Sequence, residues 1–290
     1  MASNNDKKPD LLILTLSCAD KPGIVASVAG VIARAGGNII ESSQYGDEVS
    51  RCFFMRVKFA AGTGFEKSLF QEEFQTIANE YAMIWQLSDA RKKMKTIIMV
   101  SKTDHCLNDI LYRTNIGTLP LDITRVVSNH KTLEELAHLN DIPFSHLPIT
   151  KGNKPTQEAE LRNLIQKDGA DLVILARYMQ ILSNDFSQQH FGRIINIHHS
   201  FLPGFKGAKP YKQAYERGVK IIGATAHYVT PELDEGPIIE QETERVSHAM
   251  SVRDLVAAGR DIERRTLAKA VKYHTERRVL LNGNRTVVFT

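Results

Sequence analysis

The sequence predicts an α/β protein of two domains, and three observations lead to this prediction. The chain of 290 residues exceeds the roughly 150 residues of a typical single domain. Apolar runs of strand length alternate with stretches of helical periodicity. The polar segment 89–93 separates two such patterns. We therefore predict one domain over residues 1–90 and a second over residues 91–290.

The first pattern is that of a ferredoxin-like βαββαβ domain. The turn at residues 20–23 contains Pro22 and Gly23, which end a strand and let a helix begin. In a later run, phenylalanine, methionine and valine alternate with Arg56 and Lys58, as in a half-buried strand. The predicted strands are 11–16, 38–46, 50–59 and 81–88, and the predicted helices are 24–35 and 65–80.

The second pattern is that of a Rossmann-like, mostly parallel α/β domain. Its strands are short continuous apolar runs, as expected of strands buried on both faces. The last helix begins at Ser251 with Asp254 three residues on, which approximates a capping box. The predicted strands are 96–100, 122–128, 144–147, 171–176, 193–197, 220–229 and 237–246, and the predicted helices are 104–114, 131–140, 156–168 and 251–274.

The composition excludes several classes of function. A net charge of +4 without a dense block of lysine and arginine argues against nucleic acid as a partner. No stretch reaches the ~18 apolar residues of a transmembrane helix, and the first residues lack the apolar run of a signal peptide. We therefore expect a cytoplasmic protein with no membrane partner. Cys18, Cys52 and Cys106 match no metal-ligand spacing and are expected to be buried free thiols.

Two segments place polar side chains at the ends of buried strands, where ligands gather in parallel sheets. In the first, Asn196 and His198 are two residues apart and point to the same side of an extended strand. The second carries His227 at a strand end and Asp234 in a turn. Taken singly, a strand-end histidine is usually a satisfied structural residue, and Asp-Glu-Gly-Pro is an ordinary turn.

Together these segments carry a specific pattern. It is Asn-x-His-x-Ser-x-Leu-Pro, followed by the aspartate of His-x-Val-x-x-x-x-Asp-x-Gly-Pro. With the run from Met179 to Leu182, this pattern resembles the folate-dependent formyltransferase family over residues 95–245. The turn Asp20-Lys21-Pro22-Gly23-Ile24 resembles that of the ACT domains. An ACT-like domain ahead of the catalytic domain is similar to the arrangement in the hydrolytic member of the family, so the resemblance covers nearly the whole chain.

This resemblance implies hydrolysis of 10-formyltetrahydrofolate to tetrahydrofolate and formate, which supplies formate for purine biosynthesis and balances the one-carbon folate pools. Asn196 and His198 would donate hydrogen bonds to the developing oxyanion. Asp234 would hold the attacking water and take its proton. His227 would orient Asp234 or the water. We expect no metal and no cofactor, since the folate is itself the substrate.

Two binding sites are also implied. The folate pterin is expected in a pocket walled by Met179, Ile181, Leu182, Val229 and Glu232. The alternative is that the first three are simply core residues.

The ACT-like domain is expected to bind an amino-acid effector, with glycine and methionine as candidates, at Asp20, Pro22, Gly23 and Ile24. Two alternatives stay open. The domain could serve in dimerisation without binding a ligand, or the turn could be an ordinary helix start with Pro22 in the first helical position. A homodimer or homotetramer is expected.

Other functions compete with this one. His198, His227 and Asp234 could form a metal site of two histidines and one carboxylate. The chain could be an amino-acid sensor with an inactive catalytic-like domain, or a formyltransferase to an amine such as glycinamide ribonucleotide. We favour water as the acceptor because the loop 101–106 contains no glycine, whereas the ribonucleotide transferase holds the acceptor's phosphate on a glycine-rich loop there.

Overall fold

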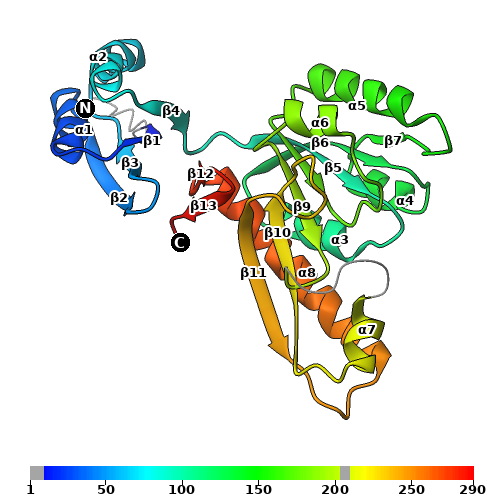
Figure 1. Ribbon diagram of the computed structural model, residues 1–290. Coiled ribbons are helices and arrows are strands. Elements are labelled where there is room, and N and C mark those ends of the chain that lie inside the picture. Colours follow the sequence, from blue (N-terminus) through cyan, green and yellow to red (C-terminus); the bar gives the residue numbers. More distant parts are fainter. Residues whose placement is uncertain (1–9, 203–209) are drawn as a thin grey trace, which may run out of the picture. The chain divides into compact units, whose positions relative to one another are not determined.

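The computed structural model describes residues 10–202 and 210–290 and divides into two compact units (Figure 1). The first unit contains the described residues up to Lys92 together with Glu276–Asn282 and Val287–Thr290. The second contains Lys93–Thr275 and Gly283–Thr286, as far as these residues are described. Sequence analysis put residues 276–290 entirely with the second domain. Part of this segment joins the first unit through hydrogen bonds, since Arg56 Nε donates to the Glu276 carbonyl at 3.0 Å.

The first unit confirms the predicted βαββαβ order. Its sheet has the strand order β2-β3-β1-β4, and every neighbouring pair is antiparallel. Helices α1 and α2 contribute Val28 and Phe74 to a core that also contains Leu14 and Val57 from the sheet. The elements are β1 (Leu11–Ala19), α1 (Ile24–Arg34), β2 (Asn38–Asp47), β3 (Cys52–Ala60), α2 (Lys67–Glu80) and β4 (Ile84–Asp89).

The turn before α1 depends on a glycine. Gly23 caps the helix with φ 92°, a left-handed conformation that glycine adopts without strain. A Cβ atom at this position would lie only 2.9 Å from the Tyr81 hydroxyl. Because α1 begins at Ile24, Pro22 does not occupy its first helical position, and that alternative is wrong.

The second unit confirms the prediction of a mostly parallel sheet. The strand order is β11-β10-β9-β8-β5-β6-β7, in which β10 alone runs antiparallel to both of its neighbours and the other paired strands are parallel. The strands are β5 (Met94–Val100), β6 (Leu121–Ser128), β7 (Phe144–His146), β8 (Leu172–Leu175), β9 (Ile194–His198), β10 (Ile221–Tyr228) and β11 (Ile238–Arg245).

Helices cover this sheet. Leu161 on α5 and Phe186 on α6 pack against Ile97, Met99 and Val173 of the central strands. Helix α8 packs along β9, β10 and β11 and also contacts α3 and α7. The helices are α3 (His105–Asn115), α4 (Glu134–His138), α5 (Lys154–Asp168), α6 (Asn184–Gln189), α7 (Pro210–Glu216) and α8 (Val252–Thr275).

The capping box at the start of α8 forms fully. The Asp254 backbone N–H donates to Ser251 Oγ, and the Ser251 backbone N–H donates to Asp254 Oδ2. Cys18, Cys52 and Cys106 are free, but Cys52 is only half-buried, because it begins β3 beside an exposed turn. Among the described residues, no helix is both long and apolar enough to cross a membrane.

Several short elements differ from the predictions. Helix α4 has five residues, Glu134–His138, in place of the predicted 131–140. Helices α6 and α7 and the two-stranded sheet of β12 (Val279–Asn282) and β13 (Arg285–Val288) were not predicted. One or two helical turns offer too few positions for a periodic pattern, but the Asn282-Gly283 pair between β12 and β13 is a hairpin signal.

Candidate active site

Adjacent antiparallel strands bring two of the predicted site residues together. Asn196 on β9 lies opposite His227 on β10, and His198 lies opposite Thr225. The Asn196 Nδ2 and His227 Nε2 atoms are 3.2 Å apart. His227 therefore reaches the site by cross-strand pairing with β9, and not because the carboxyl ends of two parallel strands meet.

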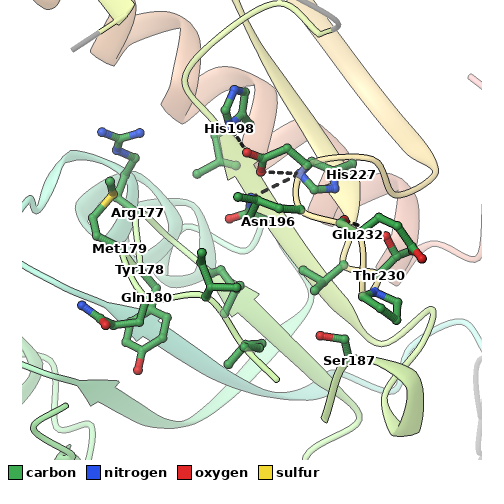
Figure 2. A pocket seen from close by; sticks show the side chains of 18 of the residues that line it. Arg177, Tyr178, Met179, Gln180, Ser187, Asn196, His198, His227, Thr230 and Glu232 are labelled. Atoms are coloured by element: carbon green, nitrogen blue, oxygen red, sulfur yellow. Dashed lines mark hydrogen bonds and ion pairs between the residues drawn. The ribbon is translucent and has the colours of Figure 1, made fainter. Parts of the chain in front are cut away.

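The turn after β10 brings Asp234 next to the side chains of His198 and His227, which are labelled in Figure 2. Its Oδ2 atom lies 3.2 Å from His198 Nδ1, and its Oδ1 atom lies 3.6 Å from His227 Nε2. Asp234 itself has φ 57°, an uncommon conformation for a residue other than glycine. Two residues on, a Cβ atom at Gly236 would lie 1.7 Å from the Tyr228 carbonyl oxygen. The glycine of the Asp-x-Gly-Pro pattern thus lets the turn approach β10 closely.

The hydrogen bonds of the two histidines indicate which nitrogens carry protons. His227 Nδ1 lies 2.9 Å from the Tyr228 carbonyl, which only accepts, so this nitrogen donates. In the neutral ring, Nε2 then accepts from the Asn196 amide. His198 Nδ1 donates to the Asp234 carboxylate. His198 Nε2 is buried without a hydrogen-bond partner among the described residues.

The charges in this cluster favour an ionised Asp234. Burial raises the pKa of its carboxyl, but the hydrogen bond from His198, together with the electrostatic interaction with His227, outweighs burial and lowers the pKa below its ordinary value. The neighbouring His199, in contrast, is held in its uncharged form. Burial, followed by the positive charges of Arg177 and His198, lowers the pKa of His199 to about 4, so this ring is neutral at pH 7.

A cavity of about 240 Å³ opens beside Asp234. It is lined by all four predicted catalytic residues and by all five predicted folate-binding residues: Met179, Ile181, Leu182, Val229 and Glu232. Met179 is 58% exposed and Ile181 is 59% exposed, so the alternative that they are core residues is wrong for these two. Leu182 is only 8% exposed, so this residue both lines the cavity and packs in the hydrophobic core.

Sequence analysis missed other residues of the cavity wall. Three of them, Arg177, Tyr178 and Gln180, lie in or beside the 179–182 run, and their place next to Met179 and Ile181 in the sequence was the signal for them, since residues 177–182 all line the cavity. Ser187 could not be inferred, because α6 was not predicted. The remaining wall residues are Leu175, Ile197, His199, Thr230, Pro231 and Leu233.

The predicted effector residues lie at the start of α1 in the first unit. Asp20, Pro22 and Gly23 are exposed, whereas Ile24 is 2% exposed and forms part of the core. The Asp20 carboxylate lies over Gly46 of β2, where an added Cβ atom would be 2.9 Å from Asp20 Oδ2. The motif residues Pro203 and Gly204 lie outside the described residues.

Comparison with known proteins identifies the family. The Formyl transferase family matches residues 94–271, and the ACT domain family matches residues 12–64. A formyltetrahydrofolate deformylase from Corynebacterium sp. (strain P-1) is 50% identical over 277 residues, which are 95% of this chain and 97% of that protein. The chain belongs to the formyltetrahydrofolate deformylase family.

Solved structures agree with this assignment to the deformylases. The crystal structure of formyltetrahydrofolate deformylase from Burkholderia mallei has a TM-score of 0.94 at 50% identity and covers 97% of this chain and 100% of that one. Glycinamide ribonucleotide transformylase 1 from Symbiobacterium toebii has a TM-score of 0.64 at 30% identity and covers 69% of this chain and 95% of that one. The predicted family and enzyme class, a hydrolase, are thus confirmed.

Proposed function

We propose that this chain hydrolyses 10-formyltetrahydrofolate to tetrahydrofolate and formate. One observation carries the proposal. In a chain of the deformylase family, an ionised Asp234 stands between two histidines at the wall of a cavity. A carboxylate in that position can hold a water molecule and accept its proton.

Each residue of the site has its own role in the reaction. Water attacks the formyl carbon as Asp234 takes a proton from it. Asn196 has a second amide hydrogen besides the one directed to His227, and it donates to the developing oxyanion. His198 stabilises the same oxyanion through its unpartnered Nε2 when that nitrogen carries a proton. The proton held by Asp234 passes to the folate nitrogen as the carbon–nitrogen bond breaks.

His227 is a positioning residue in this scheme. It is 2% exposed, and its Nδ1 donates to a backbone carbonyl, which fixes the orientation of the ring. Its Nε2 faces both Asn196 and Asp234. His227 thereby aligns an oxyanion donor and the carboxylate that holds the water.

The folate occupies the cavity beside Asp234, with its pterin against the exposed side chains of Met179 and Ile181 and the loop that contains Val229 and Glu232. No cofactor and no metal takes part, because the chain's own residues supply the proton acceptor and the oxyanion donors. Addition of a strong chelator should therefore leave the rate of formate release unchanged.

The first unit would serve in regulation and assembly. The match to the ACT domain family supports an amino-acid effector, such as glycine or methionine, bound near Asp20, Pro22 and Gly23, and supports assembly into a dimer or tetramer. Three free cysteines are consistent with a cytoplasmic protein. The formate released would supply purine biosynthesis and balance the one-carbon folate pools.

Incubation with 10-formyltetrahydrofolate alone tests the proposed activity. Formate and tetrahydrofolate should appear in equal amounts with no amine present. The Asp234→Asn variant keeps the side-chain shape and serves as the matched control, and it should release almost no formate. If the wild-type protein forms product only when an amine is added, the proposed hydrolysis is wrong.

A further inference from the structure

The segment between β8 and α6 supplies exposed side chains to the proposed folate pocket but belongs to no helix or strand. We call residues 177–182 the folate loop, since all of them line the cavity. Met179 and Ile181 in this loop are more than half exposed. A segment without the hydrogen-bond ladder of a helix or sheet depends on other elements for its conformation. Side chains from three other segments hold this loop.

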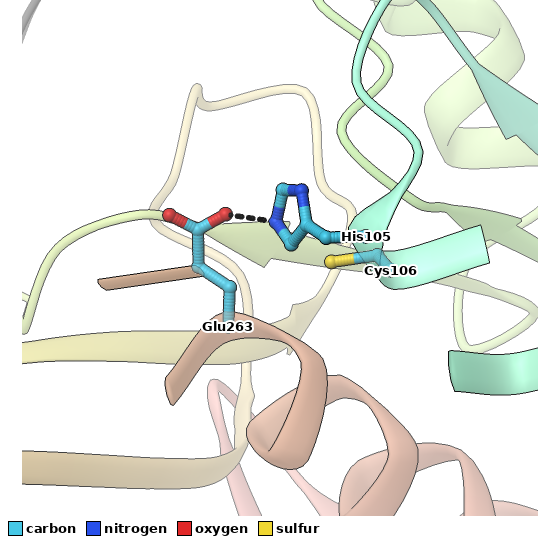
Figure 3. Close-up of side chains that lie close together, drawn as sticks. All are labelled: His105, Cys106 and Glu263. Atoms are coloured by element: carbon cyan, nitrogen blue, oxygen red, sulfur yellow. Dashed lines mark hydrogen bonds and ion pairs between the residues drawn. The ribbon is translucent and has the colours of Figure 1, made fainter. Parts of the chain in front are cut away.

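The first attachment holds the start of the folate loop. Arg177 Nε forms an ion pair at 3.3 Å with Oε2 of Glu263, which lies on α8 and is 1% exposed. The Glu263 carboxylate also accepts from His105 Nε2 at 2.8 Å (Figure 3) and from the Tyr211 hydroxyl at 2.6 Å. Burial raises the pKa of Glu263, but the hydrogen bond from His105, the charge of Arg177 and the hydrogen bond from Tyr211 together lower it. An ionised Glu263 therefore binds the Arg177 guanidinium.

The second attachment holds the middle of the folate loop. The Met179 backbone N–H donates to Ser101 Oγ at 3.0 Å, and Ser101 follows directly after β5. The Ser101 hydroxyl donates its own hydrogen to Asn129 Oδ1 at 2.7 Å. Both of these side chains are buried. Because the hydroxyl hydrogen is directed to Asn129, the Ser101 oxygen is free to accept from Met179.

The third attachment holds the end of the folate loop. Glu158 on α5 is 6% exposed, and its Oε1 accepts from the Ser183 backbone N–H at 2.7 Å. Its Oε2 accepts from the Ser183 hydroxyl, and Ser183 Oγ in turn accepts from the Phe186 backbone N–H and so caps α6. A buried carboxylate is costly unless donors compensate it, and Ser183 supplies two donors. Glu158 thus fixes the residue that directly follows the folate loop.

The packing between the folate loop and α5 is incomplete. A cavity of about 20 Å³ is lined by Glu158 and Leu161 of α5 and by Ile181 and Leu182 of the loop. This is roughly the space that one water molecule needs. Without the two hydrogen bonds to Glu158, the loop has room to shift towards α5, which would draw Ile181 away from the folate pocket.

We propose that Glu158 is a positioning residue for folate binding, which holds the folate loop against the pterin by fixing Ser183. This inference rests on the proposed function, because it takes the cavity beside Asp234 as the folate site. In the described part of the chain, Glu158 is not among the residues that line that cavity. Its loss should therefore weaken binding of the folate and leave the chemical step intact, which raises KM without lowering kcat.

Replacing Glu158 with methionine tests the inference. Methionine keeps the length of the side chain but accepts neither hydrogen bond. Helix α6 keeps another attachment to α5, since Arg162 pairs with Asp185 and donates to Gln189 at 2.9 Å, so the variant should fold. KM for 10-formyltetrahydrofolate should rise roughly tenfold, as expected for the loss of a hydrogen bond to a charged group, with kcat nearly unchanged. The Kd of tetrahydrofolate, measured by titration calorimetry, should rise by the same factor.

Three further variants separate this role from a merely structural one. Glu158→Gln keeps an oxygen that can accept from the Ser183 N–H, so its KM should rise less. Glu160→Met is the matched control, because Glu160 is an exposed glutamate of the same helix, and its KM and kcat should equal those of the wild type. Ser183→Ala should also raise KM. Combined with Glu158→Met, it should raise KM by less than the product of the two single increases, because both changes remove the same hydrogen bond.

Two outcomes would overturn the inference. One is an unchanged KM in a folded Glu158→Met variant, including a variant that only melts at a lower temperature or has a lower kcat, as a merely structural role predicts. The other is a double variant whose KM increase equals the product of the single increases. If Glu158→Met does not fold, an unchanged KM in Ser183→Ala overturns the inference instead. Absence of formate from the wild-type protein would refute the proposed function, so the two failures are distinguishable.

Discussion

The Nδ1 atom of His198 lies 3.2 Å from Oδ2 of Asp234, which joins the end of β9 to the turn after β10. This pairing couples the proposed oxyanion donor to the proposed water-binding carboxylate. A change at either residue should therefore affect both the geometry and the charge of the site.

The roles proposed for Asn196 and Asp234 predict that their substitution lowers activity to different extents. Asn196→Ala should lower the rate of formate release by about 10²–10³, the usual cost of one missing oxyanion donor. Asp234→Ala should lower it further, because both the water position and the proton acceptor disappear. The measurement is kcat for formate release from 10-formyltetrahydrofolate. Equal losses in the two variants would contradict this division of roles.

The close approach at Gly236 predicts that activity is sensitive to substitution at this position, although Gly236 takes no part in the reaction itself. Gly236→Ala would push the new Cβ atom against the Tyr228 carbonyl and displace Asp234 from the histidines. We expect a loss of roughly 10² in kcat/KM, the scale that a displacement of about 1 Å can cost. Gly30→Ala on α1, where the added atom meets only the flexible end of Arg34, is the control and should keep full activity. Normal turnover by Gly236→Ala would show that the turn tolerates another conformation.

The exposed and buried parts of the cavity wall should respond differently to truncation. Met179 is 58% exposed, so Met179→Ala should raise KM for the folate with little change in thermal stability. Leu182 is 8% exposed within the core, so Leu182→Ala should cost about 2–5 kcal/mol of stability. Thermal melting and steady-state kinetics of the two variants distinguish these effects. An unchanged KM in Met179→Ala would remove this residue from the folate pocket.

The lowered pKa of His199, about 4, predicts a loss of stability in mild acid. Between pH 6.5 and pH 4 the unfolded chain binds a proton at this histidine while the folded protein does not, so acid favours unfolding. Above pH 6.5 both states are neutral at this position, and the effect vanishes. His199→Gln should therefore lose less stability than the wild type when the pH falls from 7 to 4.5. Unfolding by urea at both pH values is the measurement, and parallel losses in the two proteins would contradict a depressed pKa.

Much of the site could be predicted because its residues follow strong apolar strands. The segments of Asn196 and His227 were recognised in this way. The pairing of those two residues could not be predicted, because it depends on β10 running antiparallel to β9, and the direction of a strand is not encoded in a short apolar run.

Other features depend on long-range packing. Glu263 lies on a long amphipathic helix, where a glutamate normally faces solvent, and its partners His105, Tyr211 and Arg177 come from three distant segments. The association of residues 276–282 with the first unit depends on hydrogen bonds such as that from Asn282 to Asp47. No local sequence pattern indicates this association. Sequence periodicity indicates which elements form, whereas these pairings require the folded sheet.

The source of the second oxygen atom in formate tests the central claim most directly. The reaction is run in water enriched in oxygen-18, with glycinamide ribonucleotide added as a competing acceptor. If Asp234 delivers water to the formyl carbon, each formate released will carry one oxygen-18 atom, and the amine will neither be formylated nor change the rate. Formylation of the ribonucleotide without labelled formate would contradict the account and make the chain a transferase.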